Sequence, residues 1–120
     1  MDEVIINGEV YVLKGSGSQH KYCDTNDMRY VIVRTRDAGV FAGYLKEKDG
    51  DEVVMVSVRR LWYWSGASSL SQLAMEGVKR PGECKFPCEV DEVRLLGAIE
   101  IIRCTELARK NISEVPVWEQ

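Results

Sequence analysis

Residues 28–63 read MRYVIVRTRDAGVFAGYLKEKDGDEVVMVSVRRLWY, and this stretch decides the fold. It contains three runs rich in β-branched and aromatic residues, which are separated by polar segments that contain glycine. Such runs predict strands, and the short polar segments predict tight turns. The predicted strands are residues 29–35, 40–47 and 52–63, and the predicted turns are residues 37–39 and 48–51. Three strands joined by short turns indicate an antiparallel meander.

A short helix is predicted directly after the meander. Ser69 and Gln72 have the spacing of a capping box, in which each side chain satisfies a backbone N–H at the start of a helix. Leu73 follows at helical spacing, Gly77 suits the left-handed residue that ends a helix, and Pro81 prevents continuation.

The last third of the chain predicts more strand and a second helix. The apolar runs 93–96 and 98–102 indicate two strands, or one strand bent at Gly97. Thr105 is placed to cap a helix over residues 106–112. The sequence therefore predicts an α+β domain, with an antiparallel β-meander sheet and two short helices.

The N-terminal part of the chain has a different character. Residues 4–13 alternate around Asn7-Gly8, which favours a β-hairpin, and residues 15–18 are a Gly/Ser linker. We therefore expect an N-terminal hairpin and linker over residues 1–27, joined to one ligand-binding domain over residues 28–120.

Composition narrows the function classes. The chain has 120 residues and a formal net charge of −3, which argues against a general DNA-binding protein. No stretch approaches the roughly 20 apolar residues that a membrane span needs, and the first residues do not resemble a signal peptide. We expect a cytoplasmic protein without membrane contact.

The residues that carry most enzyme chemistry are scarce. The single histidine, His20, lies in the polar segment, and no nucleophile elbow or phosphate-binding loop is present. Cys84 and Cys88, with His20 and Cys23, have spacing that is loose for zinc, so we expect free thiols, no metal and no cofactor. A binding protein is therefore predicted rather than an enzyme.

An arginine within the third predicted strand is the most informative candidate. With strict alternation, Arg60 shares a face with Val54, Val56, Val58, Trp62 and Trp64. A charge among apolar side chains needs a partner. That partner is an internal carboxylate, a ring of carbonyls, an aromatic ring or a bound anion, and the pattern favours a partner within the fold.

Four other arginines and one phenylalanine are candidates with ordinary alternatives. Arg29 and Arg34 lie on the first predicted strand, where charges also serve to protect a solvated edge. Arg103 and Arg109 bracket the last helix, where cations also favour the helix C-terminal end. Phe86 lies on a predicted loop, from which it either stacks on a base or fills the core.

A distinctive run, Arg-Arg-Leu-Trp-Tyr-Trp-Ser-Gly-Ala, lies at residues 59–67. Further motifs lie at residues 30–35, 38–43, 70–77, 84–86 and 115–118. Together, over residues 28–118, they resemble one family of small phage and prophage proteins, the family of Thoeris anti-defence protein one.

The resemblance implies a sponge that binds a cyclic nucleotide immune signal without cleaving it. The implied ligand is a glycocyclic ADP-ribose, with a cyclic trinucleotide at a second pocket in some members, and the implied assembly is a homodimer or a trimer of dimers in the infected bacterial host. For such a ligand we expect Phe86 to stack on a base. The other expected contacts, to phosphates or base, are Arg29, Arg34, Arg60, Trp64, Arg103 and Arg109.

Two other function classes remain open from the sequence. The segment Trp62–Trp64 could form an exposed patch for a protein partner. Alternatively, the protein could degrade a cyclic nucleotide.

Overall fold

The computed structural model describes residues 24–25 and 28–119. The hairpin predicted over residues 4–13 and the possible zinc ligands His20 and Cys23 lie outside the described residues. Within them, no helix is long and apolar enough to cross a membrane.

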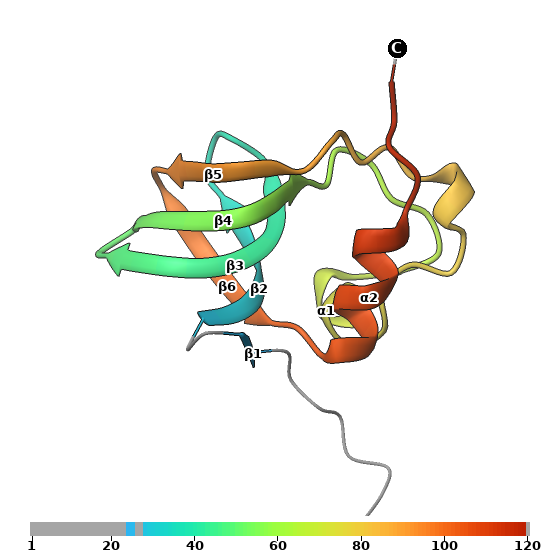
Figure 1. Ribbon diagram of the computed structural model, residues 1–120, viewed down its shortest axis with the longest axis horizontal. Helices are drawn as coiled ribbons and strands as arrows, with labels where there is room; N and C mark the ends of the chain where they lie inside the picture. The colour runs from blue at the N-terminus through green and yellow to red at the C-terminus, as the bar shows by residue number, and fades with distance from the viewer. Residues whose placement is uncertain (1–23, 26–27, 120) are drawn as a thin grey trace, which may run out of the picture.

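The described residues form a six-stranded antiparallel sheet and two α-helices, which confirms the α+β class (Figure 1). β2, β3 and β4 are consecutive neighbours, as the meander prediction requires. The strands are β1 (Asp24–Thr25), β2 (Met28–Thr35), β3 (Val40–Asp49), β4 (Glu52–Arg60), β5 (Val90–Leu95) and β6 (Ala98–Arg103). The helices are α1 (Leu70–Glu76), the 3-10 turn η1 (Pro81–Glu83) and α2 (Glu106–Glu114).

The sheet curls because its two far strands are consecutive in the chain. β5 pairs with β4, whereas β6 pairs with β2, so a short link must join opposite sides of the meander. Gly97, with φ +77°, makes this link. Its carbonyl accepts a hydrogen bond from Arg36 N at 2.9 Å. Of the two predicted possibilities at Gly97, the structure has two separate strands.

β1 extends the sheet to the N-terminal side of the predicted domain boundary. Asp24 pairs with Arg29 and Thr25 with Met28, on the edge of β2 that β6 occupies further along. The sheet therefore begins before Met28, where the sequence predicted only linker.

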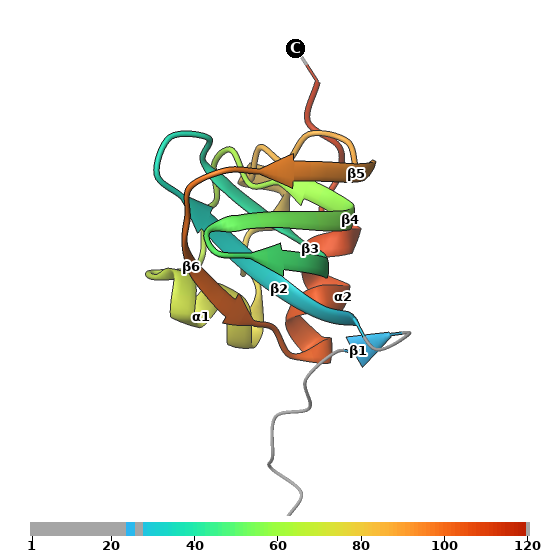
Figure 2. The ribbon, with the colours of Figure 1, turned by 90° about the vertical axis from the view of Figure 1, so that its left-hand side faces the viewer.

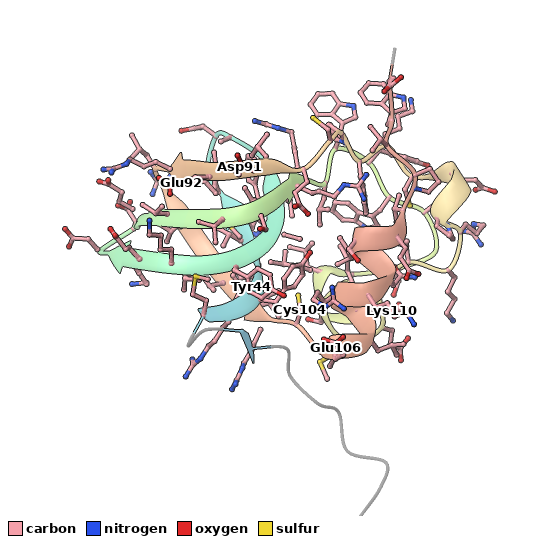
Figure 3. All side chains as sticks on the ribbon, in the orientation of Figure 1. Tyr44, Asp91, Glu92, Cys104, Glu106 and Lys110 are labelled. Atoms are coloured by element: carbon pink, nitrogen blue, oxygen red, sulfur yellow. The ribbon has the colours of Figure 1, made fainter. Side chains whose placement is uncertain are left out.

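Two apolar clusters stabilise the curled sheet on its two faces. The concave face encloses Val31, Val33, Phe41, Val53, Met55, Val58 and Leu95. The other face packs against α1 and α2, which lie behind the sheet in Figure 2. Tyr44 and Cys104 lie in this second cluster, between the sheet and α2 (Figure 3).

Both helices begin where the sequence predicts, because the capping side chains make the expected bonds. Ser69 Oγ accepts from Gln72 N at 3.1 Å, and Thr105 Oγ1 accepts from Ala108 N at 3.0 Å. The reciprocal half of the predicted capping box is different: the Gln72 side chain bonds Ser68 instead of Ser69. α2 also continues past the predicted end at residue 112 to Glu114.

A β-bulge in β4 changes which side chains face the core. Ser57 has a positive φ of 48°, and between the pairs Tyr44–Val56 and Ala42–Arg59 the strand β4 carries one extra residue. A bulge of this kind shifts the alternation of all later side chains to the opposite face. Gly43 lies opposite, where a Cβ atom would approach the Val58 Cα to 2.8 Å.

Tyr30 allows a test of the helix-side core through pH. Its side chain is 4% exposed and packs edge-on against Tyr44, with ring centroids 5.1 Å apart. Burial raises the pKa of Tyr30 well above its usual range, and the nearby Cys104 and Tyr44 raise the pKa further.

We expect the free energy of unfolding to fall more steeply with rising pH in the wild-type protein than in Tyr30→Phe. Above about pH 10 the unfolded tyrosine loses its proton while the folded one keeps it, so this group costs about 1.4 kcal/mol of stability per pH unit. Below that pH both states are protonated and the group contributes no slope. Urea unfolding at a series of alkaline pH values measures the difference, and equal slopes for the two proteins would contradict it.

Candidate ligand-binding site

The aromatic segment after β4 is held at both ends and exposed in its middle. Leu61 N donates to Val40 O at 2.8 Å, and Tyr63 pairs with Lys85 through two backbone hydrogen bonds of 2.8 and 3.3 Å. Between these anchors the Trp62 side chain is 63% exposed. A large indole fixed in solvent offers a flat apolar surface to a ligand or a partner.

Arg60 begins this segment, and its guanidinium is oriented by two contacts. Nη1 donates to the Ala38 carbonyl at 2.8 Å. The guanidinium carbon lies 4.5 Å from the centre of the Phe41 ring. Among the described residues, no carboxylate forms a salt bridge with Arg60. The side chain is therefore positioned, yet its charge is not neutralised by an acid there.

Arg60 and two indoles line one cavity of about 310 Å³, which we name the Arg60 cavity. Gly39 is part of its wall, and a Cβ atom there would lie 3.8 Å from Arg60 Nη1. Apart from Arg60, every side chain in the wall is apolar or aromatic or, at Gly39, absent. The complete lining is Ala38, Gly39, Val40, Arg60, Leu61, Trp62 and Trp64.

The buried arginine in β4 is Arg59, and not Arg60 as strict alternation predicted. The bulge at Ser57 moves Arg59 to the helix-side face, where it is 4% exposed, and leaves Arg60 exposed. Burial lowers the pKa of Arg59. Arg59 is paired with a ring of backbone carbonyls, one kind of partner that the sequence predicted for Arg60: those of Phe86, Pro87, Ile112, Val115 and Pro116, at 2.8 to 3.4 Å.

Residues 28–112 match the model of a protein family described as a domain of unknown function (DUF6948). The chain belongs to this family. No curated protein and no solved structure matches the chain. The span shared with the DUF6948 family includes every residue of the Arg60 cavity and ends within α2.

Of the residues predicted to bind the ligand, Arg60 and Trp64 line a common cavity in this DUF6948 domain. Two of the other arginines are paired with acids. Arg34 Nε bonds Glu100 at 2.9 Å, and Arg109 makes two bonds to Glu106 at 2.7 and 3.1 Å. The charge of Arg34 is thus balanced by Glu100 on the neighbouring strand β6, and that of Arg109 by Glu106 in the same helix.

Phe86 does not lie on an exposed loop, as its predicted stacking role would require. The ring is 0% exposed and belongs to the helix-side core. Its backbone pairs with Val117, and its carbonyl accepts from Trp118 N at 3.0 Å, so the C-terminal segment covers it. The ring is therefore not accessible to a base.

Arg29 and Arg103 lie away from the Arg60 cavity lining. Arg29 is exposed at the start of β2 and lines a separate hollow with residues 45–48. Arg103, at the end of β6, is half-buried opposite Val31. The sequence alone could not show which arginine lines the cavity. Part of the cavity wall is residues 38–40, and the folded β2–β3 turn places them beside Arg60.

Among the described residues, Cys84, Cys88 and Cys104 are not joined in disulfides. Cys84 is buried, and its sulfur accepts from Ser65 N at 3.4 Å. No cluster of three metal-binding side chains occurs within residues 24–25 and 28–119. Within the described residues, the candidate binding site is therefore the Arg60 cavity, whose wall has one oriented guanidinium and two indole rings.

Proposed function

We propose that this protein is a phage anti-defence sponge, which binds and sequesters a cyclic nucleotide immune signal without cleaving it. The proposed ligand is a glycocyclic ADP-ribose, and the proposed place of action is the cytoplasm of the infected bacterial host. The observation that carries the proposal is the Arg60 cavity, where one oriented guanidinium lies beside two indole rings.

The chemistry of that cavity suits a ligand that has both a phosphate and a planar base. A guanidinium carries five N–H donors, and Arg60 uses one of its nitrogens for the Ala38 carbonyl. Arginine can present parallel donors to phosphate oxygens, and indole faces stack on bases at about 1–3 kcal/mol per base. Gly39 leaves room for a ligand close to the backbone.

Sequestration without cleavage fits the side chains that line the cavity. The lining residues are Ala38, Gly39, Val40, Arg60, Leu61, Trp62 and Trp64, and this set contains no histidine, carboxylate or thiol side chain. General acid–base catalysis needs such a group within reach of the reacting bond. A ligand held here would therefore leave intact.

The cavity volume favours completion by a second copy of the chain. About 310 Å³ is near the lower end of the roughly 300–1,000 Å³ typical of small-molecule sites. Because Trp62 and Tyr63 are 63% and 51% exposed, a second protomer could bury them together with the ligand. We propose a homodimer or a trimer of dimers, which light scattering after gel filtration would measure.

The experiment that separates the function classes uses the whole protein and a panel of cyclic nucleotides. Calorimetric titration measures binding, and chromatography of the ligand after heat denaturation of the complex shows whether it survived. We expect saturable binding and recovery of intact ligand. Recovery of a cleaved product would instead establish an enzyme, and absence of binding across the panel would refute the sponge.

Arg60→Ala is expected to weaken ligand binding about 10- to 100-fold, which corresponds to one charge-assisted hydrogen-bonded contact. Arg60→Lys should recover only part of the affinity, because an ammonium cannot reproduce a planar fork. The matched control is Arg94→Ala, which removes an exposed arginine that is paired with Glu52 at 2.6 Å on a different strand. Equal affinity of Arg60→Ala and wild type would contradict the assignment.

A protein–protein module is the second candidate, and the exposed side chains favour it. Besides Trp62 and Tyr63, Val117 is also exposed, at 52%. Lys85 Nζ lies 5.9 Å from the centre of the Tyr63 ring and 5.7 Å from the centre of the Trp118 ring. Large exposed aromatic residues are typical of interfaces. A stable complex with a phage or host protein, together with no cyclic nucleotide binding, would favour this candidate.

A further inference from the structure

A second hollow lies where the segment after the aromatic residues meets the segment after α1. Its volume is about 330 Å³, and we name it the Lys79 hollow; its lining is Gly66, Ala67, Ser68, Gln72, Lys79 and Arg80. The two segments are in close contact, since Lys79 N donates to Gly66 O at 3.2 Å. A Cβ atom on Gly66 would lie 2.6 Å from Lys79 N, so the glycine is required for this approach.

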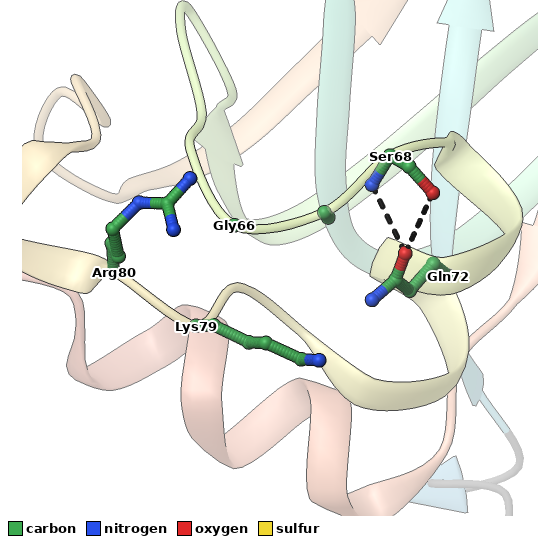
Figure 4. A pocket seen from close by; sticks show the side chains of 6 residues that line it. Gly66, Ser68, Gln72, Lys79 and Arg80 are labelled. Carbon is green, nitrogen blue, oxygen red and sulfur yellow. Dashed lines mark hydrogen bonds between the residues drawn. The ribbon is translucent and has the colours of Figure 1, made fainter.

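The amide of Gln72 is fixed with its nitrogen toward the hollow. Ser68 N and Ser68 Oγ both bond the same atom of Gln72, at 3.0 and 2.8 Å. Because a backbone N–H can only donate, that atom must be the amide oxygen. The amide nitrogen makes one long contact, of 3.5 Å, to Glu76, which leaves its second N–H for another acceptor. Figure 4 shows this nitrogen and the Lys79 ammonium directed toward the same space.

The remaining wall of the hollow is cationic. Arg80 Nε bonds Ser65 Oγ at 2.9 Å and lies 3.3 Å from Glu83, which orients the guanidinium by its inner nitrogen. Its two outer nitrogens are not used by these contacts, and Figure 4 shows them on the side of Gly66. Lys79 is exposed. No acidic side chain is among the lining residues, so the hollow collects donors and positive charge.

We propose that the Lys79 hollow binds a phosphate group, as inorganic phosphate or as the phosphate of a nucleotide. Lys79 supplies a point charge, Arg80 supplies its outer N–H groups, and Gln72 supplies a neutral donor whose orientation Ser68 fixes. Glu83 contacts only the inner nitrogen of Arg80, and Glu76 makes one long contact to Gln72. The remaining donors favour an oxyanion over a cation or a neutral molecule. The assignment goes beyond the proposed sponge function and is independent of the Arg60 cavity.

The test is a nuclear magnetic resonance titration of the ¹⁵N-labelled full chain with inorganic phosphate, adenosine monophosphate and adenosine. We expect saturable shifts of the amides of Gly66, Ala67 and Lys79 with the two phosphates and none with adenosine. A larger affinity for adenosine monophosphate would identify the nucleotide as the source of the phosphate. Equal binding of adenosine, or no saturable shift at these amides with millimolar phosphate, would overturn the proposal.

Two variants sharpen this test without disturbing the core. Gln72→Glu keeps acceptors for Ser68 but places a negative charge at the hollow, and Lys79→Ala removes a cation from an exposed side chain. Each is expected to weaken phosphate binding about tenfold or more. Arg94→Ala is the control for lost positive charge, and Arg60→Ala should leave these shifts intact. If Gln72→Glu bound phosphate as wild type does, the hollow would not be the site, whatever the result for the Arg60 cavity.

Discussion

Arg59→Leu is expected to lower the free energy of unfolding by about 3–5 kcal/mol, because it leaves buried carbonyls without donors. The guanidinium bonds carbonyls from two stretches that are distant from Arg59 in sequence: residues 86–87, and residues 112–116 at the end of α2 and just after it. Its carbon also lies 5.5 Å from the Phe86 ring centre. One side chain of β4 therefore joins the sheet, α2 and the C-terminal segment.

Urea unfolding measures this loss directly, and two variants of similar size make it specific. Arg59→Lys should lose nearly as much, since one ammonium has three donors and cannot reach the whole ring of carbonyls. Arg94→Leu removes an exposed, paired arginine and should cost about 1 kcal/mol or less. A comparable cost for Arg94→Leu and Arg59→Leu would show that the carbonyl ring contributes little.

Gly77→Ala is the second change with a large expected effect, about 3–5 kcal/mol of destabilisation. Gly77 ends α1 with φ +80° and ψ −158°, a conformation that residues with a side chain rarely adopt. A Cβ atom would also overlap the side chain of Asn111. That side chain accepts from Val78 N and donates to Val78 O, each at 2.8 Å, and so joins α2 to the end of α1.

Gly50→Ala separates backbone strain from the steric clash in this second prediction. Gly50 also has a positive φ, +62°, but a Cβ atom there would meet nothing within 4 Å, so it should cost only about 1–2 kcal/mol. Asn111→Ala removes the two nearest overlapping atoms and keeps its own Cβ at 2.7 Å, so the clash is reduced. The double variant with Gly77→Ala should therefore lose less than the sum of the two single variants. Strict additivity in thermal unfolding would refute the proposed contact.

Local patterns were enough to predict most of the elements in the described residues. The meander follows from short-range alternation and turn chemistry, and Ser69 and Thr105 cap helices because each bond spans only three residues. The third strand was predicted too long, since its extension to residue 63 continues an apolar and aromatic run. In the structure, β4 ends at Arg60, and Tyr63 then pairs with Lys85.

The candidate site was predicted less well, and one residue explains most of the difference. A bulge at Ser57 reverses the alternation after it, so Arg59 is buried and Arg60 reaches the cavity. The residue type at position 57 does not predict a positive φ, because serine has no preference for that conformation comparable to the preference of glycine. The burial of the Phe86 ring could not be predicted for a similar reason, since the residues that cover it, Val117 and Trp118, lie far along the chain.

The sequence by itself determined the strands, the helix starts and the presence of arginine beside aromatic residues, because those features depend on neighbours a few positions away. The tertiary structure alone decided which arginine is buried, which are paired with acids, and which lines a cavity. Those outcomes depend on contacts between distant segments, such as Arg59 with Ile112 and Arg34 with Glu100. The energy of a charged side chain depends on the groups that surround it in the fold, and the order of residues along the chain does not show which groups those are.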